Sequence, residues 1–528
     1  MSDGWRSILG EGERKRKLKQ IYKDIMAFIK AKDFLSFGIE NTEGLYIGKT
    51  EAEGENKKGQ GLREYYEDYL GIDNEFVNGK FIFTGRKGVG KSAFVKYLCN
   101  AAEDNPDEIY VSVVRNDKID YEKILQSVPD EVGNKDQLIF EWIVLTKFVQ
   151  LIIAHGQGKY TKEFEALTKF EEKNSGIASV DKWMTMEENR RNGWTVNFSE
   201  LLKAFPLAFS KEFNRSSMRA PFYALIPALR NIIVKMLGFE VCKDVNFIIV
   251  FDDLDIHFEM SNIDHKKRLM ELIRVAKNYN TDYLPKQEQR VLLMLRDDIA
   301  RQLDGIATDK NKIFSSYEYN LNWYKSDTGL SVEHSKLRKF INKRILIAFR
   351  KKGISCDTVD PWKSLVNDNP CYEYKNKSAF KYILDHTFYR PRDLVAFFDE
   401  LDKTSFRLPM SPADVKQRLK KYFSWSLVEI GDELSNTFTS DEIKLIFKLF
   451  ETMAENNKTE YRVICDFIKS HNLPDNTFDT LFEYNLIIPK DDQDYQYFSY
   501  RERPFISHKE RYSYCLPQCI YKHYNSKA

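Results

Sequence analysis

The chain has 528 residues and carries 81 Lys and Arg against 79 Asp and Glu, a formal net charge of +2. This length exceeds what one compact core holds, so it predicts two to four domains. Hydrophobic residues make up 42% of the chain and aromatic residues 14%, which excludes a disordered protein. The nearly neutral charge excludes a global basic field, so any contact with nucleic acid would have to come from a local patch.

The N-terminal segment, residues 1–36, is basic and amphipathic. It opens with "MSDGWRSILGEGERKRK", which lacks the apolar core of a signal peptide, and the seven scattered cysteines indicate a reducing, cytoplasmic setting. Apolar residues at helical spacing in residues 13–35 predict a helix whose opposite face is basic. That face is the best local candidate for nucleic-acid binding, although a solvated face on a packing helix explains the same charges.

A glycine-rich segment separates an apolar strand from an apolar helix in "FIFTGRKGVGKSAFVKYLCN", residues 81–100. A glycine, four further residues and then Gly-Lys-Ser match the P-loop pattern. Glycines let successive backbone N–H groups converge on phosphate, and the helix start adds its own unpaired N–H groups. Lys91 is expected to contact the outer phosphates and the Ser92 hydroxyl to ligate Mg²⁺. The predicted nucleotide-binding residues are Gly85, Arg86, Lys87, Gly88, Val89, Gly90, Lys91, Ser92 and Ala93.

Part of the same segment also fits the dinucleotide-binding pattern G-x-G-x-x-A, from Gly88 to Ala93. That pattern requires an acidic residue at the end of the next strand to hold a ribose. The next predicted strand ends in "VVRND", where Asp117 is a weak candidate. The Lys-Ser pair therefore favours a nucleoside triphosphate.

Short apolar strands alternate with helical stretches from Lys80 onward: "KFIFTG", "EIYVSVV", "NFIIVFDD", "RVLLMLR" and "YEYNLNW". This alternation predicts an α/β domain whose mostly parallel sheet is covered by helices on both faces. Residues 155–243 are interpreted as a mostly helical insertion. The longest apolar run, "WIVLTKFVQLIIA", is shorter than the ~20 residues of a membrane span, so it predicts a buried helix and no membrane partner.

Polar residues follow two of the predicted strands. Asp252 and Asp253 end "NFIIVFDD", at the edge of an open α/β sheet where ligands bind. We assign Asp252 to Mg²⁺ and Asp253 to activation of the attacking water. Arg296 ends "RVLLMLR" and is a candidate sensor of the terminal phosphate. Pairing with Asp297 or Asp298 at the next helix start explains the same residue equally well.

Strand signals become rare after Trp323. Residues 331–350 and 377–425 predict helices, and "RPRDL" places Arg392 in the first turn of one of them, from which it would reach the nucleotide unless it only forms surface pairs. Residues 436–528 begin with helices and end in a short aromatic hairpin, which suits a winged-helix module. The predicted domains are an N-terminal helix (1–36), a P-loop core (37–325), a helical lid (326–435) and a winged-helix-like domain (436–528).

Taken together, "GRKGVGKS", "FDDLD", "LRDDI" and "RPRDL" resemble a group of prokaryotic P-loop ATPases, the STAND, KAP and origin-initiator-like branch of AAA+ proteins. The resemblance implies a sheet ordered 5-1-4-3-2, a helical lid and often a winged-helix domain. It also implies that Lys91, Ser92, Asp252, Asp253, Arg296 and Arg392 act on phosphate, magnesium, water and sensing. An aspartate in the water-activating position is shorter than glutamate, so slow turnover is expected. The segment "TDKNKIFSS" lacks the arginine that ring-forming members lend to a neighbour.

Three functions follow from these features. The first is a Mg²⁺-dependent ATPase that acts as a switch engaging an effector or partner protein, plausibly in bacterial signalling or anti-phage defence, as the resemblance implies; homo-oligomers are left open. The second is an initiator-like ATPase that binds DNA through the winged-helix domain and the basic N-terminal helix. From Asp441 onward 12 Lys and Arg stand against 14 Asp and Glu, which disfavours DNA. The third, a small-molecule kinase, is disfavoured by the paired carboxylates.

Overall fold

A computed structural model gives the fold. It describes residues 40–51, 54–56, 61–115, 121–126, 128–156, 161–174, 195–208, 218–242, 244–254, 262–284, 288–327, 329–435, 437–456, 458–490 and 509–525. The predicted N-terminal helix, the candidate Asp117 and residues 491–508 of the predicted aromatic hairpin lie outside these residues.

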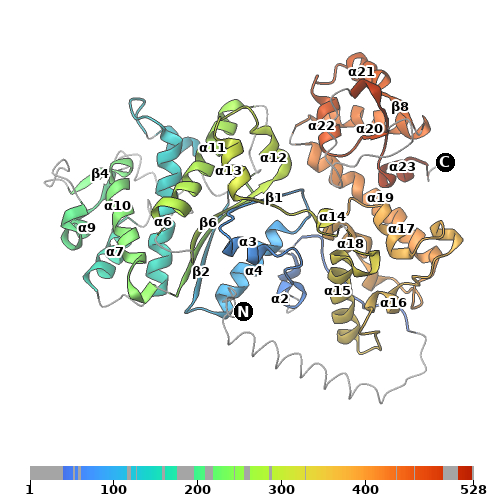
Figure 1. The fold of residues 1–528 in the computed structure, drawn as a ribbon, viewed down its shortest axis with the longest axis horizontal. Helices are drawn as coiled ribbons and strands as arrows, with labels where there is room; N and C mark the ends of the chain where they lie inside the picture. Colours follow the sequence, from blue (N-terminus) through green and yellow to red (C-terminus); the bar gives the residue numbers. More distant parts are fainter. Residues whose placement is uncertain are drawn as a thin grey trace. The chain divides into compact units, whose positions relative to one another are not determined.

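The chain divides into two compact units, each of which is described by itself (Figure 1). Unit 2 contains residues 73–85 and 94–320. Unit 1 contains residues 1–72 and 321–528, together with the short segment 86–93. Most of the glycine-rich loop therefore groups with the C-terminal half of the chain, whereas the strand that precedes the loop belongs to unit 2. The four-part domain division drawn from the sequence stays a prediction.

Unit 2 is built on a five-stranded sheet whose neighbouring strands are all parallel. Its order is β2 (Ile109–Arg115), β5 (Asn246–Asp252), β6 (Gln289–Arg296), β1 (Ile82–Gly85) and β7 (Glu318–Asn320). Numbered along the chain as core strands, this is the order 5-1-4-3-2, which confirms the predicted fold class. All eight residues of β6 are buried, as expected for a strand covered on both faces.

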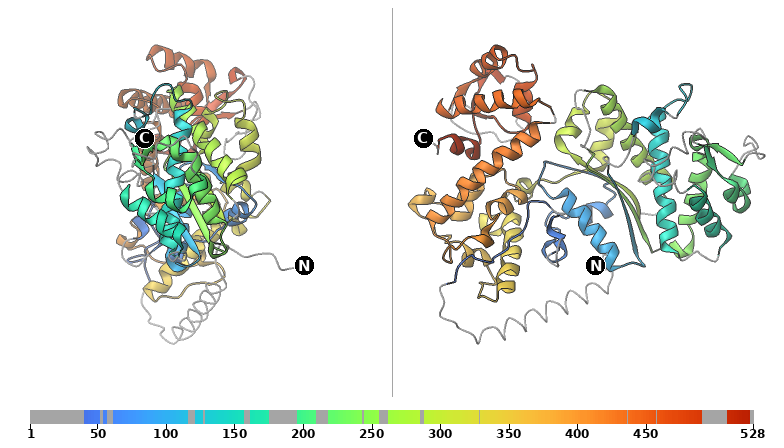
Figure 2. Two further views of the ribbon diagram at one scale, coloured as in Figure 1. Left: turned by 90° about the vertical axis from the view of Figure 1, so that its left-hand side faces the viewer. Right: turned by 180° about the vertical axis from the view of Figure 1, so that it is seen from behind.

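Helices cover both faces of this sheet. The views in Figures 1 and 2 place α4 (Lys91–Asp104) on one face and α6 (Lys135–His155) on the other. The pairing of β1 with β6 begins at Leu293, so it does not include Val291 of β6. Val291 instead forms hydrogen bonds with a residue of a short π-helix, Tyr279–Tyr283. There the Asn280 amide accepts from Val291 N (2.9 Å) and donates to Val291 O (2.8 Å), so its side chain stands in for a neighbouring strand.

Helix α6 contains the long apolar run. By length and composition alone it could cross a membrane, but 72% of its most apolar window is buried inside the protein. It packs against β2, β5, α10 (Phe222–Leu237) and α11 (Ile263–Asn278), and its Glu141 forms an ion pair with Arg230 of α10. These contacts support the prediction of a buried core helix.

The predicted insertion is mostly helical where it is described, with α7 (Lys162–Lys173), α9 (Ser199–Ala204) and α10. It also contains an antiparallel pair that the sequence did not predict, β3 (Thr195–Asn197) with β4 (Arg219–Pro221). Each of these strands has three residues, too few for a strand periodicity to appear in the sequence.

The first part of unit 1 is helical, with α15 (Lys336–Lys352), α16 (Pro361–Leu365), α17 (Ala379–Asp385), α18 (Pro391–Phe397) and α19 (Pro412–Leu434). Buried arginines join these helices and their connections. Arg338 binds Asp360 and Asp368 and lies over the rings of Trp362 and Phe380. Arg418 donates to the Phe397 carbonyl (2.9 Å). A buried guanidinium with several acceptors fixes the connection that it bonds.

The last part of unit 1 has the order helix, strand, helix, helix, strand, strand, helix. Its elements are α20 (Ser440–Asn456), β8 (Thr459–Glu460), α21 (Tyr461–Ser470), α22 (Thr477–Glu483), β9 (Ile488–Lys490), β10 (Ser513–Cys515) and α23 (Gln518–Asn525). The three strands form an antiparallel sheet in the order β8-β10-β9. This arrangement is that of a winged helix, as predicted.

Candidate nucleotide site

The glycine-rich loop lies between the end of β1 at Gly85 and the start of α4 at Lys91, so the predicted strand–loop–helix context is present. Gly88 (φ +83°) and Gly90 (φ +110°) both have backbone conformations that L-amino acids rarely adopt. These two glycines let the chain turn tightly between a strand and a helix. The following Ser92 is exposed in the first helical turn.

Inside the loop, the Arg86 carbonyl accepts two hydrogen bonds. One comes from Val89 N (3.4 Å) and closes the turn, and the other comes from Lys91 Nζ (3.2 Å). This bond of the Lys91 ammonium group is long, and its acceptor is a neutral carbonyl. A phosphate oxygen would be a stronger, charge-assisted acceptor for this group.

Donors from outside the loop bind the next three carbonyls. They are Arg390 Nη1 to Lys87 O (2.9 Å), the Arg392 backbone N–H to Gly88 O (3.3 Å) and Trp323 Nε1 to Val89 O (2.9 Å). All of these groups belong to unit 1. Four consecutive carbonyls of the loop thus accept hydrogen bonds on the protein side.

The amides of the loop have the opposite role. Within the described part of the chain, no hydrogen-bond acceptor faces the backbone N–H of Gly88, Gly90 or Ser92. Convergent N–H groups before and at the first turn of a helix bind anions, because the helix dipole adds positive potential there. The loop therefore offers what a phosphate group requires.

Two side chains of the loop point toward the C-terminal half rather than toward a ligand. Arg86 Nη2 donates to the carbonyl of Tyr484, and its guanidinium lies 5.8 Å from the ring centre of Phe388. Lys87 Nζ lies 3.4 Å from Glu429 Oε2 of α19. The observed contacts of these two predicted nucleotide-binding residues therefore direct both side chains to other parts of unit 1.

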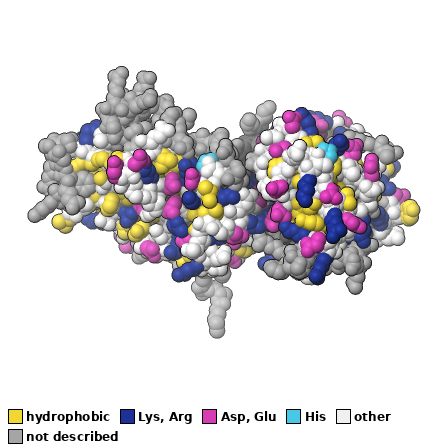
Figure 3. Space-filling view, turned by 90° about the horizontal axis from the view of Figure 1, so that it is seen from above, with side chains coloured by type: hydrophobic (Ala, Val, Ile, Leu, Met, Phe, Trp, Pro, Cys, Tyr) yellow, Lys and Arg dark blue, Asp and Glu magenta, His cyan; other side chains and the backbone are white. Residues whose placement is uncertain are grey.

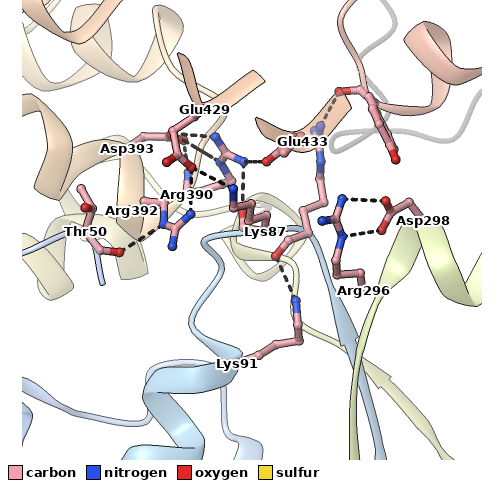
Figure 4. Close-up of polar contacts among 12 residues, drawn as sticks. Thr50, Lys87, Lys91, Arg296, Asp298, Arg390, Arg392, Asp393, Glu429 and Glu433 are labelled. Atoms are coloured by element: carbon pink, nitrogen blue, oxygen red, sulfur yellow. Dashed lines mark hydrogen bonds and ion pairs between the residues drawn. The ribbon is translucent and has the colours of Figure 1, made fainter. Parts of the chain in front are cut away.

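Helix α18 begins at the loop (Figure 4). Arg392, the predicted lid residue, donates from Nε to Thr50 O (3.1 Å) and from Nη1 to Glu429 Oε2 (2.9 Å). Arg390 caps the helix and binds the buried carboxylates of Asp393 and Glu433. Burial lowers the pKa of Arg390, but the two carboxylates outweigh it and the pKa is raised overall. Arg390 is therefore a fixed cation, and the sensing role of Arg392 stays a prediction.

The two predicted carboxylates lie at the carboxyl edge of the sheet in unit 2. Asp252 is the last residue of β5, is 2% exposed and pairs in register with Arg115 of β2. Asp253 has a left-handed φ of +52° and forms a half-exposed ion pair with Arg115, Nε to Oδ2 at 3.8 Å. A left-handed aspartate is an uncommon, strained conformation of the kind that accumulates at functional sites.

Arg296 lies at the same edge, because it is the register partner of Gly85. Its guanidinium binds both carboxylate oxygens of Asp298 (3.0 and 2.8 Å), and both side chains are buried (Figure 4). The structure thus has the pairing that the sequence left open as the alternative to phosphate sensing. The sensing role stays a prediction.

One polar group at this edge was missed by sequence reasoning. The hydroxyl of Thr84, directly before Gly85, donates to Glu318 Oε1 (2.5 Å) and accepts from Asn320 Nδ2 (2.9 Å). In the longer stretch "YEYNLNW", Glu318 and Asn320 alternate with aromatic and apolar residues, and this period of two over seven residues was the available signal. Trp323 was missed as well, because its partner is a backbone carbonyl and leaves no motif.

The described residues contain no group of three His, Cys, Asp or Glu side chains able to hold a metal ion. Cys515 and Cys519 are both buried free thiols. A magnesium ion that accompanies a nucleotide does not require such a group, because it keeps several waters and takes one or two protein ligands plus phosphate oxygens. A serine hydroxyl such as that of Ser92 and a carboxylate such as that of Asp252 are ligands of this kind, and their assignment to magnesium stays a prediction.

The sheet order, the strand–loop–helix motif and the winged helix define a P-loop α/β fold with a helical C-terminal half. Residues 335–431, which run from α15 into α19, match the protein family described as the FunZ-associated C-terminal helical domain. None of the curated proteins compared with the chain matches it. Among solved structures, that of Cdc6p from Pyrobaculum aerophilum is similar with 10% identity over 92% of this chain and 97% of that chain. The TM-score of this likeness is 0.25.

Proposed function

We propose that this protein is a Mg²⁺-dependent ATPase that works as a molecular switch, coupling its nucleotide state to the engagement of a partner protein. The loop from Gly85 to Ala93 binds the phosphates through its backbone N–H groups and Lys91. Ser92 and Asp252 hold the magnesium ion, Asp252 through water. Asp253 orients and activates the attacking water.

One observation carries the binding part of this proposal. Every carbonyl from Arg86 to Val89 is already bonded within unit 1, whereas the amides of Gly88, Gly90 and Ser92 have no acceptor among the described residues. A loop that served only to reverse the chain direction would not be expected to have all of its carbonyls bonded and several of its amides without acceptors. An anion of the size of a phosphate satisfies them.

The switching part rests on the contacts of the loop with the C-terminal half. Arg86 binds the Tyr484 carbonyl, Lys87 pairs with Glu429 of α19, and Arg392 at the start of α18 binds the loop backbone. A change in loop geometry on nucleotide binding would alter these bonds, so one bound state favours one arrangement of the helical segments. This supports a switch rather than a simple hydrolase.

Turnover is expected to be slow. Asp253 forms a half-exposed ion pair with Arg115 (3.8 Å), and this pair competes with a water molecule for the carboxylate. Asp253 also has a shorter side chain than the glutamate of related ATPases. A slow hydrolysis step is what a timed switch requires.

The charges of the winged helix favour a protein partner over DNA. In a helix-turn-helix, the second helix enters the major groove. Here that helix is α22, whose charged residues are Asp479 and Glu483, both exposed, and it contains no Lys or Arg. On the face seen in Figure 3, basic and acidic side chains are interspersed rather than gathered by sign. Phosphate repulsion at α22 therefore counts against the DNA-binding alternative.

Calorimetry with Mg·ATP tests the binding proposal. The wild-type chain is expected to bind, and Lys91→Ala to bind at least tenfold more weakly, since it loses a charge-assisted bond to phosphate. Lys96→Ala, five residues further along α4, is the matched control and should bind like the wild type. No heat of binding for the folded wild-type chain would refute the proposal.

Limited proteolysis with and without Mg·ATP tests the coupling. The cleavage pattern of residues 437–525 should change with nucleotide in the wild type. Arg86→Ala should keep Mg·ATP affinity within about threefold, since only its side chain is lost, but its cleavage pattern should no longer respond. A full response in Arg86→Ala would show that the Tyr484 contact does not transmit the nucleotide state.

A further inference from the structure

We infer that Trp323 and Arg390, neither of which belongs to the P-loop motif, are positioning residues that set the orientation of the loop amides for phosphate. The inference rests on the proposed function, because it concerns the same loop. It adds the residues that give the loop its shape. The side chains of Trp323 and Arg390 bind backbone carbonyls of the loop and would not contact the nucleotide.

The planarity of the peptide bond carries the argument. In a trans peptide the carbonyl of one residue and the N–H of the next lie in one plane and point in opposite directions. A bond from Trp323 Nε1 to Val89 O (2.9 Å) therefore fixes the direction of the Gly90 N–H. A bond from Arg390 Nη1 to Lys87 O (2.9 Å) fixes the direction of the Gly88 N–H in the same way.

These are the two glycine amides for which the described residues provide no acceptor. The intervening plane is fixed as well, since Gly88 O accepts from Arg392 N (3.3 Å) and Val89 N bonds back to Arg86 O (3.4 Å). Glycines at φ +83° and +110° are otherwise free to rotate their peptide planes. The external donors remove that freedom before a ligand arrives, which is preorganisation.

Trp323 is held in place by its own surroundings. Its side chain is 6% exposed and packs against Tyr69 (ring centres 6.2 Å apart) and Phe340 (5.8 Å, edge to face). Val89 is 5% exposed, so its carbonyl has little access to water when the indole N–H is removed. The Val89–Gly90 plane would then turn to find another donor and would carry the Gly90 N–H away from the phosphate position.

Arg390 is fixed more strongly. It is 5% exposed, and its Nε and Nη2 bind Asp393. Its Nη1 donates both to Glu433 Oε1 (3.2 Å) and to Lys87 O (2.9 Å). Replacing this cation would remove the guanidinium that two buried carboxylates bind, so it should destabilise the region strongly. Trp323 is therefore the residue through which the inference is best tested.

The test compares Trp323→Phe with Trp142→Phe. Phe keeps an aromatic ring at position 323 but has no N–H. Trp142 is a buried tryptophan in contact with Phe222, and its Nε1 has no acceptor among the described residues, so its replacement controls for loss of ring size alone. Both variants are checked for folding by thermal unfolding before binding is measured.

Calorimetry with Mg·ATP and with Mg·pyrophosphate is the first readout. Trp323→Phe should weaken both ligands by a similar factor, about tenfold, which corresponds to ~1.4 kcal/mol, because the amides contact phosphate and not the base. Trp142→Phe should bind both ligands like the wild type. A second readout uses fluorine NMR of the chain labelled with 5-fluorotryptophan, whose seven tryptophans give seven signals. The signal absent from Trp323→Phe should shift on titration with Mg·pyrophosphate.

The outcomes separate the two proposals. If the wild type binds neither ligand, the proposed nucleotide function fails. If the wild type binds and folded Trp323→Phe binds equally well, with no shift of the Trp323 fluorine signal, the positioning role is wrong and the nucleotide function stands. Equal losses in Trp323→Phe and Trp142→Phe would also refute the positioning role, because ring size alone would explain them.

Discussion

The Cβ that Gly88 lacks would lie 2.8 Å from the Cβ of Arg392 and 2.9 Å from its Cδ. Side-chain carbons do not approach this closely, so the loop and the start of α18 can meet only because position 88 is glycine. In the P-loop pattern, a glycine is required because the backbone has a positive φ and because it must approach the phosphate closely. The structure adds a second reason, close packing against an arginine 304 positions further along the chain.

Gly88→Ala and Gly90→Ala should differ for this reason. Both replace a glycine with positive φ, which costs about 1–2 kcal/mol for an L-residue. At Gly90 the added methyl group has no neighbour within 4 Å, whereas at Gly88 it collides with Arg392. Gly88→Ala should therefore lower the free energy of unfolding, measured in urea, by more than Gly90→Ala. Equal losses would mean that the contact with Arg392 relaxes at no cost.

Asp253→Asn should separate hydrolysis from binding. The amide keeps the shape of the side chain but cannot accept a proton from water, so ATP hydrolysis should fall by about 100-fold or more. The affinity for Mg·ATP should stay within about threefold in calorimetry, because Asp253 is assigned no contact with the phosphates. Asp282→Asn, an exposed carboxylate of unit 2, serves as the control. Hydrolysis at the parent rate in Asp253→Asn would show that another group activates the water.

Replacing the buried pair of Arg296 and Asp298 should distinguish a sensor from a structural ion pair. Either single alanine variant leaves one buried charge and should lower stability by about 3–5 kcal/mol. The double variant Arg296→Met/Asp298→Leu should recover most of that loss, because apolar residues of similar volume replace the pair. If Arg296 also senses phosphate, the stable double variant should hydrolyse ATP at least about tenfold more slowly. A wild-type rate in that variant would leave Arg296 a structural role only.

His386 should make stability dependent on pH on the acid side. Burial lowers the pKa of His386 below its ordinary value of 6.5, and its Nδ1 lies 2.7 Å from the Tyr382 carbonyl, to which the neutral ring donates. Below about pH 6.5 the unfolded chain binds a proton that the folded chain resists, so the free energy of unfolding falls as pH falls and is constant above that value.

Urea unfolding between pH 5 and 8 measures this effect. One proton taken up only by the unfolded chain gives a slope of at most about 1.4 kcal/mol per pH unit. His386→Phe should reduce the slope below pH 6.5, whereas His334→Gln, a change at an exposed histidine of the same unit, should not. An unchanged slope in His386→Phe would assign the acid sensitivity to other groups.

Local sequence patterns were enough to predict most of the fold. Four of the five core strands are mostly apolar runs of four to eight residues, and the fifth, β7, has three residues. The alternation of these strands with helices leaves few sheet orders to choose from. The pair β3 and β4 was missed because three residues carry no detectable period. The winged helix was recognised from its order of elements even though residues 491–508 lie outside the described part of the chain.

The candidate site was predicted less completely. The residues proposed to touch phosphate, Gly85 through Ala93, follow from spacing alone, because a tight turn before a helix needs glycines at fixed positions. The partners of the arginines do not follow from spacing. The sequence left Arg296 open between sensing phosphate and pairing with Asp297 or Asp298, and Arg392 open between contacting the nucleotide and forming surface pairs. Each of these side chains can reach several acceptors, and only the fold decides which of them is near.

The sequence by itself determined the class of this protein: a strand, a glycine turn, a helix and a pair of carboxylates are local features, and local backbone geometry follows from neighbouring residues. Only the tertiary structure decided what holds the loop in shape. Trp323 and Arg390 bind carbonyls 234 and 303 positions away in the chain. A backbone carbonyl is the same at every residue, so a bond to it leaves no trace in the sequence and appears only when the chain is folded.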